Sequence, residues 1–368
     1  MDINVQGLTL RYGDTAAVQD LDLTVGDGES LVLLGQSGCG KTSTMRCIAG
    51  LERPSTGRIT VGDRVLFDSD HGTDCPPHKR NIGMVFQSYA IWPHMTVFDN
   101  VAFPLTMQRV NKSEIKRRVA ETLELVGLEG FADRGASLLS GGQMQRVALA
   151  RSVVMRPSVM LLDEPLSNLD ARLRHRLRGD LRELQVRLGL TSVYVTHDQE
   201  EALALADRIA MMQHGRIVQI GGPNEIYAKP LSASIADFLG VGNIIAVDAI
   251  DATGVRITGT DVTLNVEPFS TGPDLKACIR GEDIVVGDDV AAHMNTLEGR
   301  LLAKEFLGAS ATYRLALNGG AEIEVIGSKH RQLHAAVGDS VRVGIPVDAV
   351  QVLPHDVSSP AIREEAAA

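Results

Sequence analysis

One short run of residues has the composition and spacing of a phosphate-binding loop. It comprises Gly35, Gln36, Ser37, Gly38, Cys39, Gly40, Lys41 and Thr42, and Ser43 follows it directly. Glycines let a backbone wrap closely around phosphate oxygens so that successive N–H groups point inward. Lys41 would reach the β- and γ-phosphates, and the Thr42 hydroxyl would ligate Mg²⁺. The run predicts a site for a nucleoside triphosphate with magnesium; the alternative is a glycine-rich turn before a helix.

An acidic pair follows an apolar run further along the chain. Residues 159–162 are continuously apolar and lead into Asp163 and Glu164. In α/β proteins a buried strand carries its ligand-binding residues at its carboxyl end. We expect Asp163 to hold Mg²⁺ through a water molecule and Glu164 to accept the proton of the attacking water. The alternative is a turn after a core strand, which the phosphate loop upstream makes less favourable.

A second candidate anion site lies between these two motifs. Leu139 is followed by Ser140, Gly141, Gly142 and Gln143, which open an expected helix. A Ser-Gly-Gly helix start combines backbone N–H groups, a hydroxyl and a positive dipole end. Because one nucleotide needs only one phosphate loop, this motif suggests a nucleotide bound mainly by a second copy in a head-to-tail pair. The alternative is an ordinary helix cap.

The hydrophobic pattern indicates the elements that must position these residues. Strands are expected at residues 30–34, 81–87, 159–163 and 192–196, and a helix at 41–51. Apolar strands that alternate with amphipathic runs predict a largely parallel sheet covered by helices, the fold of an α/β P-loop NTPase domain. Asn111 and Glu114 fit a helix cap, and apolar residues follow them at helical spacing. We therefore expect a helical insert over about residues 88–155.

The composition changes after Gly240. Short β-prone segments at residues 244–250, 255–258, 277–280 and 340–345 are separated by Gly, Asp or Pro. They predict a small all-β domain, either a barrel of the OB type or a sandwich. The expected organisation is a nucleotide-binding domain over 1–238, a β domain over 239–355 and a frayed tail over 356–368.

Taken in order, the motifs resemble the ATP-binding subunit of an ABC transporter. The resemblance also includes Tyr12, Gln87, Asp170 within the loop of residues 167–170, and His197. It implies that Tyr12 stacks on adenine, that Gln87 contacts magnesium and the water, and that His197 holds the γ-phosphate. Gln87 and His197 would then join Glu164 as catalytic residues. It further implies that Ser140 to Gln143 face the ATP of the partner subunit and that Asp170 lies at the dimer seam.

The resemblance extends into the second domain. Residues 280–284 and 305–309 are similar to stretches of the TOBE-like β-barrel extension of importer ATPases for sugars, polyamines and iron(III), although Gly281 stands where these proteins commonly have proline. The implied partners are a second copy, membrane permease subunits and, through them, a solute-binding protein. The implied location is the cytoplasmic face of the cell membrane. The junction at 238–243 leans toward polyamine or iron(III) importers.

Charge and composition bear on the alternative functions of the chain. The 36 basic and 46 acidic residues give a net charge of −10, which opposes extended contact with nucleic acid. The four cysteines have no metal-ligand spacing, and no run approaches a membrane span. The rival interpretations are a soluble ABC-type ATPase acting on nucleic acid and an ATP-switched regulatory module.

Two further features have alternative interpretations. Trp92 either anchors a permease helix or packs within the helical insert. The arginines at 172–182 predict a solvated helix face.

Overall fold

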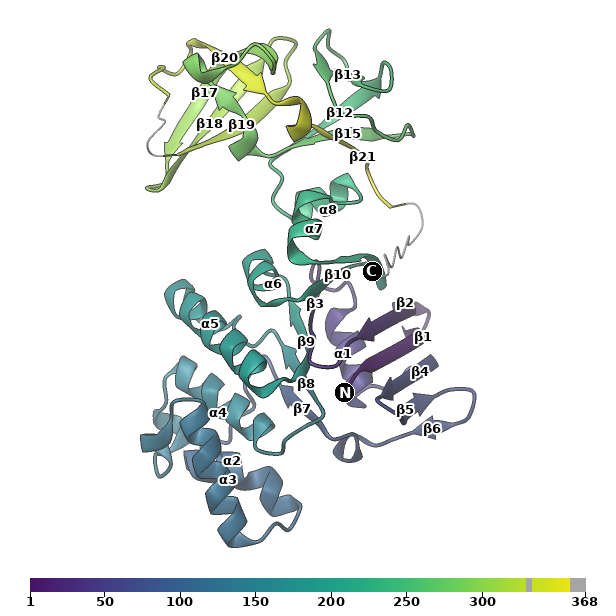
Figure 1. The fold of residues 1–368 in the computed structure, drawn as a ribbon, viewed down its shortest axis with the longest axis vertical. Helices are drawn as coiled ribbons and strands as arrows, with labels where there is room; N and C mark the ends of the chain where they lie inside the picture. Colours follow the sequence, from purple (N-terminus) through teal and green to yellow (C-terminus); the bar gives the residue numbers. More distant parts are fainter. Residues whose placement is uncertain (329–332, 358–368) are drawn as a thin grey trace. The chain divides into compact units, whose positions relative to one another are not determined.

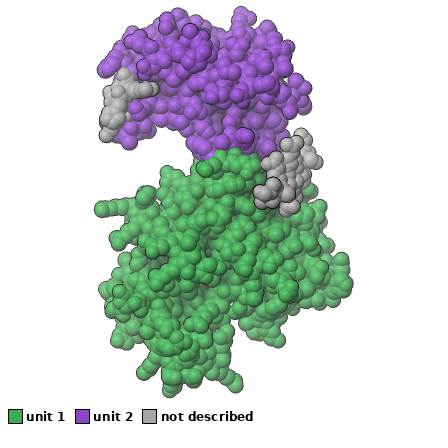
Figure 2. Space-filling view, in the orientation of Figure 1, with its two compact units in different colours: residues 1–226, 360–368 green, residues 227–359 purple. Residues whose placement is uncertain are grey.

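The computed structural model describes residues 1–328 and 333–357, and Figure 1 shows the fold. The chain divides into two compact units, and the boundary in the sequence falls between Ile226 and Tyr227 (Figure 2). This division falls 12 residues before the compositional boundary at 238 and 239. Most of the tail predicted over 356–368 lies outside the described residues. Among the described residues, none of the helices combines the length and the apolar character needed to cross a membrane.

A six-stranded sheet forms the centre of the first unit, in the order β11-β10-β3-β9-β8-β7. The strands are β3 (Ser30–Leu34), β7 (Ile82–Val85), β8 (Val159–Asp163), β9 (Thr191–Thr196), β10 (Arg208–Gln213) and β11 (Arg216–Gly221). All neighbours are parallel except β10 and β11. Every residue of β3 and β8 is buried, which explains their continuously apolar sequences. The predicted parallel sheet is confirmed.

An antiparallel sheet completes the core of this unit, in the order β2-β1-β4-β5-β6. Its strands are β1 (Ile3–Tyr12), β2 (Thr15–Val25), β4 (Thr56–Val61), β5 (Arg64–Asp68) and β6 (Thr73–Asp74). Helix α1 (Lys41–Ala49) buries Met45 and Ile48 in one apolar cluster with residues of both sheets. Figure 1 shows α5 (Ala171–Leu188) and α6 (Gln199–Leu205) on the other face of the parallel sheet.

The predicted helical insert is confirmed between β7 and β8. It contains α2 (Val97–Met107), α3 (Lys112–Leu125) and α4 (Gly141–Val153). Asn111 caps α3, because its side chain accepts the Glu114 N–H at 2.8 Å. Short 3₁₀ turns occur within the insert at η2 (Glu129–Phe131) and η3 (Ala136–Leu138), and another, η1 (Pro77–Lys79), precedes β7. Beyond β11 the chain continues through α7 (Pro223–Ala228) and α8 (Ala233–Phe238).

The second unit contains the predicted all-β domain, which follows α8. One antiparallel sheet has the order β14-β13-β12-β15-β21, and the other has the order β16-β20-β17-β18-β19. The strands are β12 (Asn243–Ala249), β13 (Gly254–Ile257), β14 (Thr263–Asn265), β15 (Leu275–Ile279), β16 (Val285–Val286), β17 (Asn295–Phe306), β18 (Ser310–Leu317), β19 (Glu322–Ser328), β20 (Ser340–Ile345) and β21 (Gln351–Pro354). Short turns form η4 (Gly281–Asp283), η5 (Gly287–Asp289) and η6 (Val347–Ala349). The two sheets enclose one apolar core, so the domain is an open half-barrel.

Two buried asparagines join these sheets. The Asn243 amide donates to the Ile279 and Glu324 carbonyl oxygens at 3.0 and 2.9 Å, and its Oδ1 accepts the Glu324 N–H. Asn295 similarly donates to the carbonyl oxygen of Asn265 and accepts its N–H. The presence of glycine at position 281 also has a steric explanation, because an added Cβ would lie 2.9 Å from Ile326.

Candidate nucleotide site

The phosphate loop connects the end of β3 to the start of α1. Gly40 caps the helix with a φ of +105°, and an added Cβ would lie 2.5 Å from the Ala17 carbonyl oxygen. Gly38 also has a positive φ, of +80°, but the space beside its Cα is open. The first turn of α1 contains no acidic residue and Gly40 supplies no side-chain cap. The helix start therefore keeps N–H groups and a positive dipole end for an anion.

The Lys41 side chain folds along this loop. It is only 5% exposed, and its Nζ donates to the carbonyl oxygens of Gly35 and Gln36 at 2.7 and 2.8 Å. Nζ also lies 3.7 Å from the Cys39 thiol. Among the described residues, no carboxylate forms an ion pair with this ammonium, and its hydrogen bonds go to carbonyl oxygens. A buried cation without an ion-pair partner favours an anionic ligand at this loop.

Thr42 and Asp163 meet where the phosphate loop approaches the end of β8. The Thr42 hydroxyl donates to Asp163 Oδ1 at 3.0 Å, and Asp163 is 6% exposed. Burial raises the pKa of Asp163, while the Thr42 hydrogen bond opposes this shift. A hydroxyl and a carboxylate are hard oxygen ligands that suit Mg²⁺ when phosphate oxygens complete its coordination. The donor set therefore fits magnesium with a bound triphosphate.

The three predicted catalytic residues converge on one carboxylate. Glu164 Oε2 accepts from Gln87 Nε2 at 3.1 Å, and Glu164 Oε1 lies 2.9 Å from His197 Nδ1. The Glu164 backbone has a φ of +42°, a conformation that a residue with a side chain rarely adopts, and its N–H donates to the Val195 carbonyl oxygen. Such local strain is typical of functional sites. The structure thus brings Gln87, Glu164 and His197 together.

Tyr12 lies at the end of β1 and is 54% exposed. Its hydroxyl donates to Glu52, and the Ser43 hydroxyl, which follows the phosphate loop, acts to lower its pKa. The hydrogen bond to Glu52 is the main cause that raises the pKa of the tyrosine. The ring is therefore held next to the end of the phosphate loop and has a face open to a ligand.

Ser140 to Gln143 form a helix cap at the start of α4. The Gln143 N–H donates to Ser140 Oγ, and the Ser140 N–H donates to Gln143 Oε1 at 3.0 Å. Added Cβ atoms on Gly141 and Gly142 would lie 3.2 Å from Leu169 and 3.1 Å from Leu173. In Figure 1 this end of the molecule lies apart from α1. The structure does not bring these four residues to the phosphate loop of the same chain.

The arginine run near Asp170 is not uniformly solvated. Asp170 is exposed and caps α5 by accepting the Leu173 N–H at 2.9 Å. Arg174, Arg178 and Arg182 are spaced four residues apart, and each forms an ion pair with a carboxylate beyond β9. The expected solvated face is therefore wrong for these three arginines. The signal in the sequence was their spacing of one helical turn, opposite acidic residues at 198, 200 and 207.

Trp92 combines packing with partial exposure. Its ring centroid lies 4.4 Å from that of Phe103, and the Arg151 guanidinium lies 4.8 Å from its centre. Asn100 holds the Trp92 backbone by accepting its N–H and donating to its carbonyl oxygen. The ring is therefore rigidly placed on the helical insert while remaining half-buried.

A parallel sheet whose strand ends carry these residues defines a P-loop ATPase domain, here followed by an all-β half-barrel. The model of the ABC transporter family matches residues 18–167, and the TOBE domain model matches residues 277–353. The chain belongs to the family of ABC import ATP-binding proteins that carry a TOBE domain, and it is an ABC-type ATPase.

Relatives with curated names support this membership. The chain is 46% identical over 307 residues to the Fe(3+) ions import ATP-binding protein FbpC of Agrobacterium fabrum, which covers 83% of this chain and 84% of that protein. It is 42% identical over 360 residues to the spermidine/putrescine import ATP-binding protein PotA of Methylococcus capsulatus, which covers 95% and 92%. It is 53% identical over 239 residues to the trehalose/maltose import ATP-binding protein MalK of Thermococcus litoralis, which covers 65% and 64%.

Solved structures resemble the first unit. CbiO1 of Clostridium perfringens, part of the ABC transporter complex cbiONQ, has a TM-score of 0.56 and 31% identity, which covers 62% of this chain and 90% of that chain. A dimeric structure of the ATP-binding cassette MJ0796 in a post-hydrolysis state with ADP and phosphate has a TM-score of 0.52 and 29% identity, which covers 60% and 98%.

Proposed function

We propose that two copies of this chain close head to tail on two molecules of MgATP and reopen after hydrolysis, and that this cycle drives a membrane permease. The observation that carries the proposal is the meeting of Gln87 and His197 on the Glu164 carboxylate beside the phosphate loop. The dimeric structure of MJ0796 supports the pairing of two such cassettes.

The phosphate loop supplies the binding half of this site. Its backbone N–H groups, with Ser37 and Ser43 beside them, cradle the phosphates, and Lys41 turns from the loop carbonyl oxygens toward the β- and γ-phosphates. Thr42 and Asp163 hold Mg²⁺, with Gln87 nearby. When bound, the magnesium ion neutralises charge on the transferring phosphoryl group.

The three converging residues supply the catalytic half. Glu164 accepts the proton of the attacking water, and Gln87 Nε2 orients both the carboxylate and the water. His197 donates a hydrogen bond to the γ-phosphate. In the structure it contacts Glu164 at 2.9 Å, so it lies within reach of the same reaction centre. Tyr12 stacks its exposed face on the adenine.

A second copy completes the site. Ser140, Gly141, Gly142 and Gln143 of one protomer face the ATP held by the phosphate loop of the other, and Asp170 lies at the seam. The exposed positions of Ser140, at the start of α4, and of Asp170 support this arrangement. Hydrolysis is then a property of the dimer, so a monomer binds ATP and barely hydrolyses it.

The permease subunits and a solute-binding protein complete the transporter. The half-buried Trp92 ring is the proposed anchor for a permease helix, which places this ATPase at the inner face of the cell membrane. The names of relatives include importers of iron(III), polyamines and sugars. We favour polyamine or iron(III) as the solute.

Steady-state ATP hydrolysis by the purified chain tests the proposal. Glu164→Gln keeps the size of the side chain and removes the proton acceptor, so the rate should fall by about 100-fold or more. Glu200→Gln is the matched control, because Glu200 is an exposed carboxylate on α6 whose ion pair with Arg178 lies outside the site. Equal rates for wild type and Glu164→Gln would refute catalysis and favour an ATP-switched module.

A further inference from the structure

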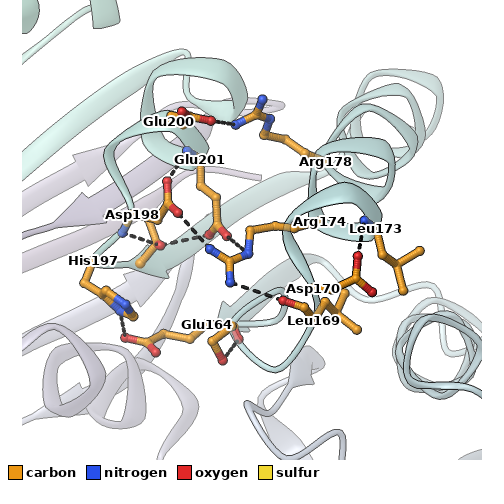
Figure 3. Close-up of polar contacts among 12 residues, drawn as sticks. Glu164, Leu169, Asp170, Leu173, Arg174, Arg178, His197, Asp198, Glu200 and Glu201 are labelled. Carbon is orange, nitrogen blue, oxygen red and sulfur yellow. Dashed lines mark hydrogen bonds and ion pairs between the residues drawn. The ribbon is translucent and has the colours of Figure 1, made fainter. Parts of the chain in front are cut away.

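We propose that Arg174 is a positioning residue that links the loop ending in Asp170 to His197 and thereby aligns the catalytic histidine. The inference rests on the proposed roles of Glu164 and His197. Figure 3 shows the Arg174 guanidinium between the two loops. Its Nη2 donates to the Leu169 carbonyl oxygen at 3.2 Å, and its Nη1 donates to Asp198 Oδ2 at 3.1 Å. Its Nε lies 3.8 Å from Glu201 Oε1.

The far end of this link is rigid. Asp198 Oδ1 accepts the Glu201 N–H at 3.0 Å, and the Asp198 N–H donates to Thr196 Oγ1 at 2.9 Å. Glu201 is 2% exposed, and its Oε2 accepts from the Tyr194 and Thr196 hydroxyls. Its other oxygen faces Arg174. Both the backbone N–H and the carboxylate of Asp198 are therefore hydrogen-bonded. Because Asp198 is the next residue after His197, a displacement of the Asp198 carboxylate also moves the histidine.

The near end touches two motifs that the proposed dimer places at its seam. Leu169 is 7% exposed, and its Cδ2 lies where a Cβ on Gly141 would be 3.2 Å away. Asp170 follows Leu169 and caps the helix that carries Arg174. Arg174 lies one helical turn after Asp170, the residue expected at the seam. From there its side chain holds the carbonyl oxygen of Leu169, the residue before Asp170. Docking of a partner against this loop would be transmitted through Arg174 and Asp198 to His197 and Glu164.

The planar guanidinium is suited to this task. Two of its nitrogens donate to acceptors on two separate loops, and Nε makes only a long ion-pair contact with Glu201 on α6. A lysine ammonium provides only one compact donor centre. Arg178, one turn further along α5, contacts the exposed Glu200 carboxylate at 3.3 Å. It offers a matched comparison on the same helix, because its ion pair joins the same two helices without contacting Leu169 or Asp198.

The experiment compares Arg174→Met and Arg178→Met in the full chain. We expect Arg174→Met to lower kcat by about 10- to 100-fold, as misplacement of a catalytic group does, while KM for ATP stays within about twofold. Arg178→Met should keep kcat within about twofold of wild type. Trp92 fluorescence and circular dichroism verify folding. Asp198→Asn retains the Oδ1 helix cap but weakens the acceptor for Arg174, so it should lower kcat in the same direction.

A double mutant separates positioning from general destabilisation. If Arg174 acts through His197, adding Arg174→Met to His197→Ala should cause no further loss of kcat. The inference would be overturned if the two substitutions lowered kcat by the product of their separate effects. It would also be overturned if the kcat of Arg174→Met equalled that of Arg178→Met. If Glu164→Gln abolishes hydrolysis while Arg174→Met does not reduce it, only this inference fails. A wild-type chain without ATP hydrolysis would overturn the proposed function and this inference with it.

Discussion

Arg80 offers a sharp test of what holds the phosphate-loop helix in place. Its side chain is 1% exposed. Its guanidinium donates to the carbonyl oxygens of Cys47 and Ile48, each at 2.9 Å, and to that of Cys75 at 2.7 Å. Cys47 and Ile48 belong to the last turn of α1, where unpaired carbonyl oxygens carry the negative end of the helix dipole. The Arg80 charge therefore satisfies and neutralises the carboxyl end of the helix whose other end binds phosphate.

The expected effect of Arg80→Met follows from these contacts. The three hydrogen bonds to carbonyl oxygens contribute about 1.5 to 3 kcal/mol each, and a fourth, to Asp74 Oδ1 at 3.4 Å, is also lost. The substitution also removes the cost of burying the charge, about several kcal/mol, which offsets part of the loss. Burial lowers the pKa of Arg80 for the same reason. We expect the free energy of unfolding of the first unit to fall by about 3 to 5 kcal/mol, as when one partner of a buried charged pair is removed.

Urea unfolding followed by tryptophan fluorescence measures this change. Trp92 is the chain's single tryptophan and lies in the first unit, so the signal reports that unit alone. With an m-value of about 3 kcal/mol/M, the midpoint should move by about 1 M or more. Arg53→Ala is the matched control, because it removes an exposed ion pair to Asp74, which also pairs with Arg80. A midpoint shift no larger than that of Arg53→Ala would refute the reasoning.

Three further predictions concern other parts of the chain. Burial raises the pKa of Cys47 from 9.0 to about 12, so iodoacetamide at neutral pH should leave this thiol unmodified in peptide mapping by mass spectrometry. Since the folded pKa lies above the unfolded value, the stability that the protonated thiol contributes is present below pH 9.0 and is lost as the pH rises toward about 12. The urea midpoint of wild type should therefore fall over this pH range more than the midpoint of Cys47→Ala does. Asn243→Ala should destabilise the second unit by about 2 kcal/mol, because the Glu324 peptide groups lose their partners, and hydrogen exchange of β12 and β19 should accelerate while Trp92 unfolding is unchanged. Trp92→Ala should reduce transport by the reconstituted complex and retain basal ATP hydrolysis; unchanged transport would remove Trp92 as an anchor.

Strand and helix positions were predictable where local pattern determines them. The bounds of β3, β8 and β20 agree with their apolar or β-branched runs, and Asn111 caps α3 as expected. Buried parallel strands show themselves because both faces require apolar residues. The half-barrel was less predictable in detail. Its sheets depend on pairings between distant segments, such as β15 with β21, whose short sequences do not specify a partner.

Buried polar residues were the hardest feature to anticipate. The sequence around Arg80 resembles a solvated loop, yet the carbonyl oxygens that bind its guanidinium come from a helix 32 and 33 residues earlier. The sequence pattern likewise groups Arg174 with exposed arginines. In the structure its guanidinium donates to the Leu169 carbonyl oxygen on one loop and to Asp198 on another. Charge at such positions depends on tertiary partners, which local periodicity does not reveal.

The order of the parallel strands explains why the candidate catalytic residues converge. Strand β8 lies between β7 and β9 in the sheet, and Asp163 is in register with Val195. Glu164 follows the end of β8, so it is flanked by Gln87 after β7 on one side and by His197 after β9 on the other. The sequence places each residue after a strand but does not give the order of the strands. A carboxylate on the middle strand is the only one of the three that can contact both others directly, which is why Glu164 occupies the centre of the group.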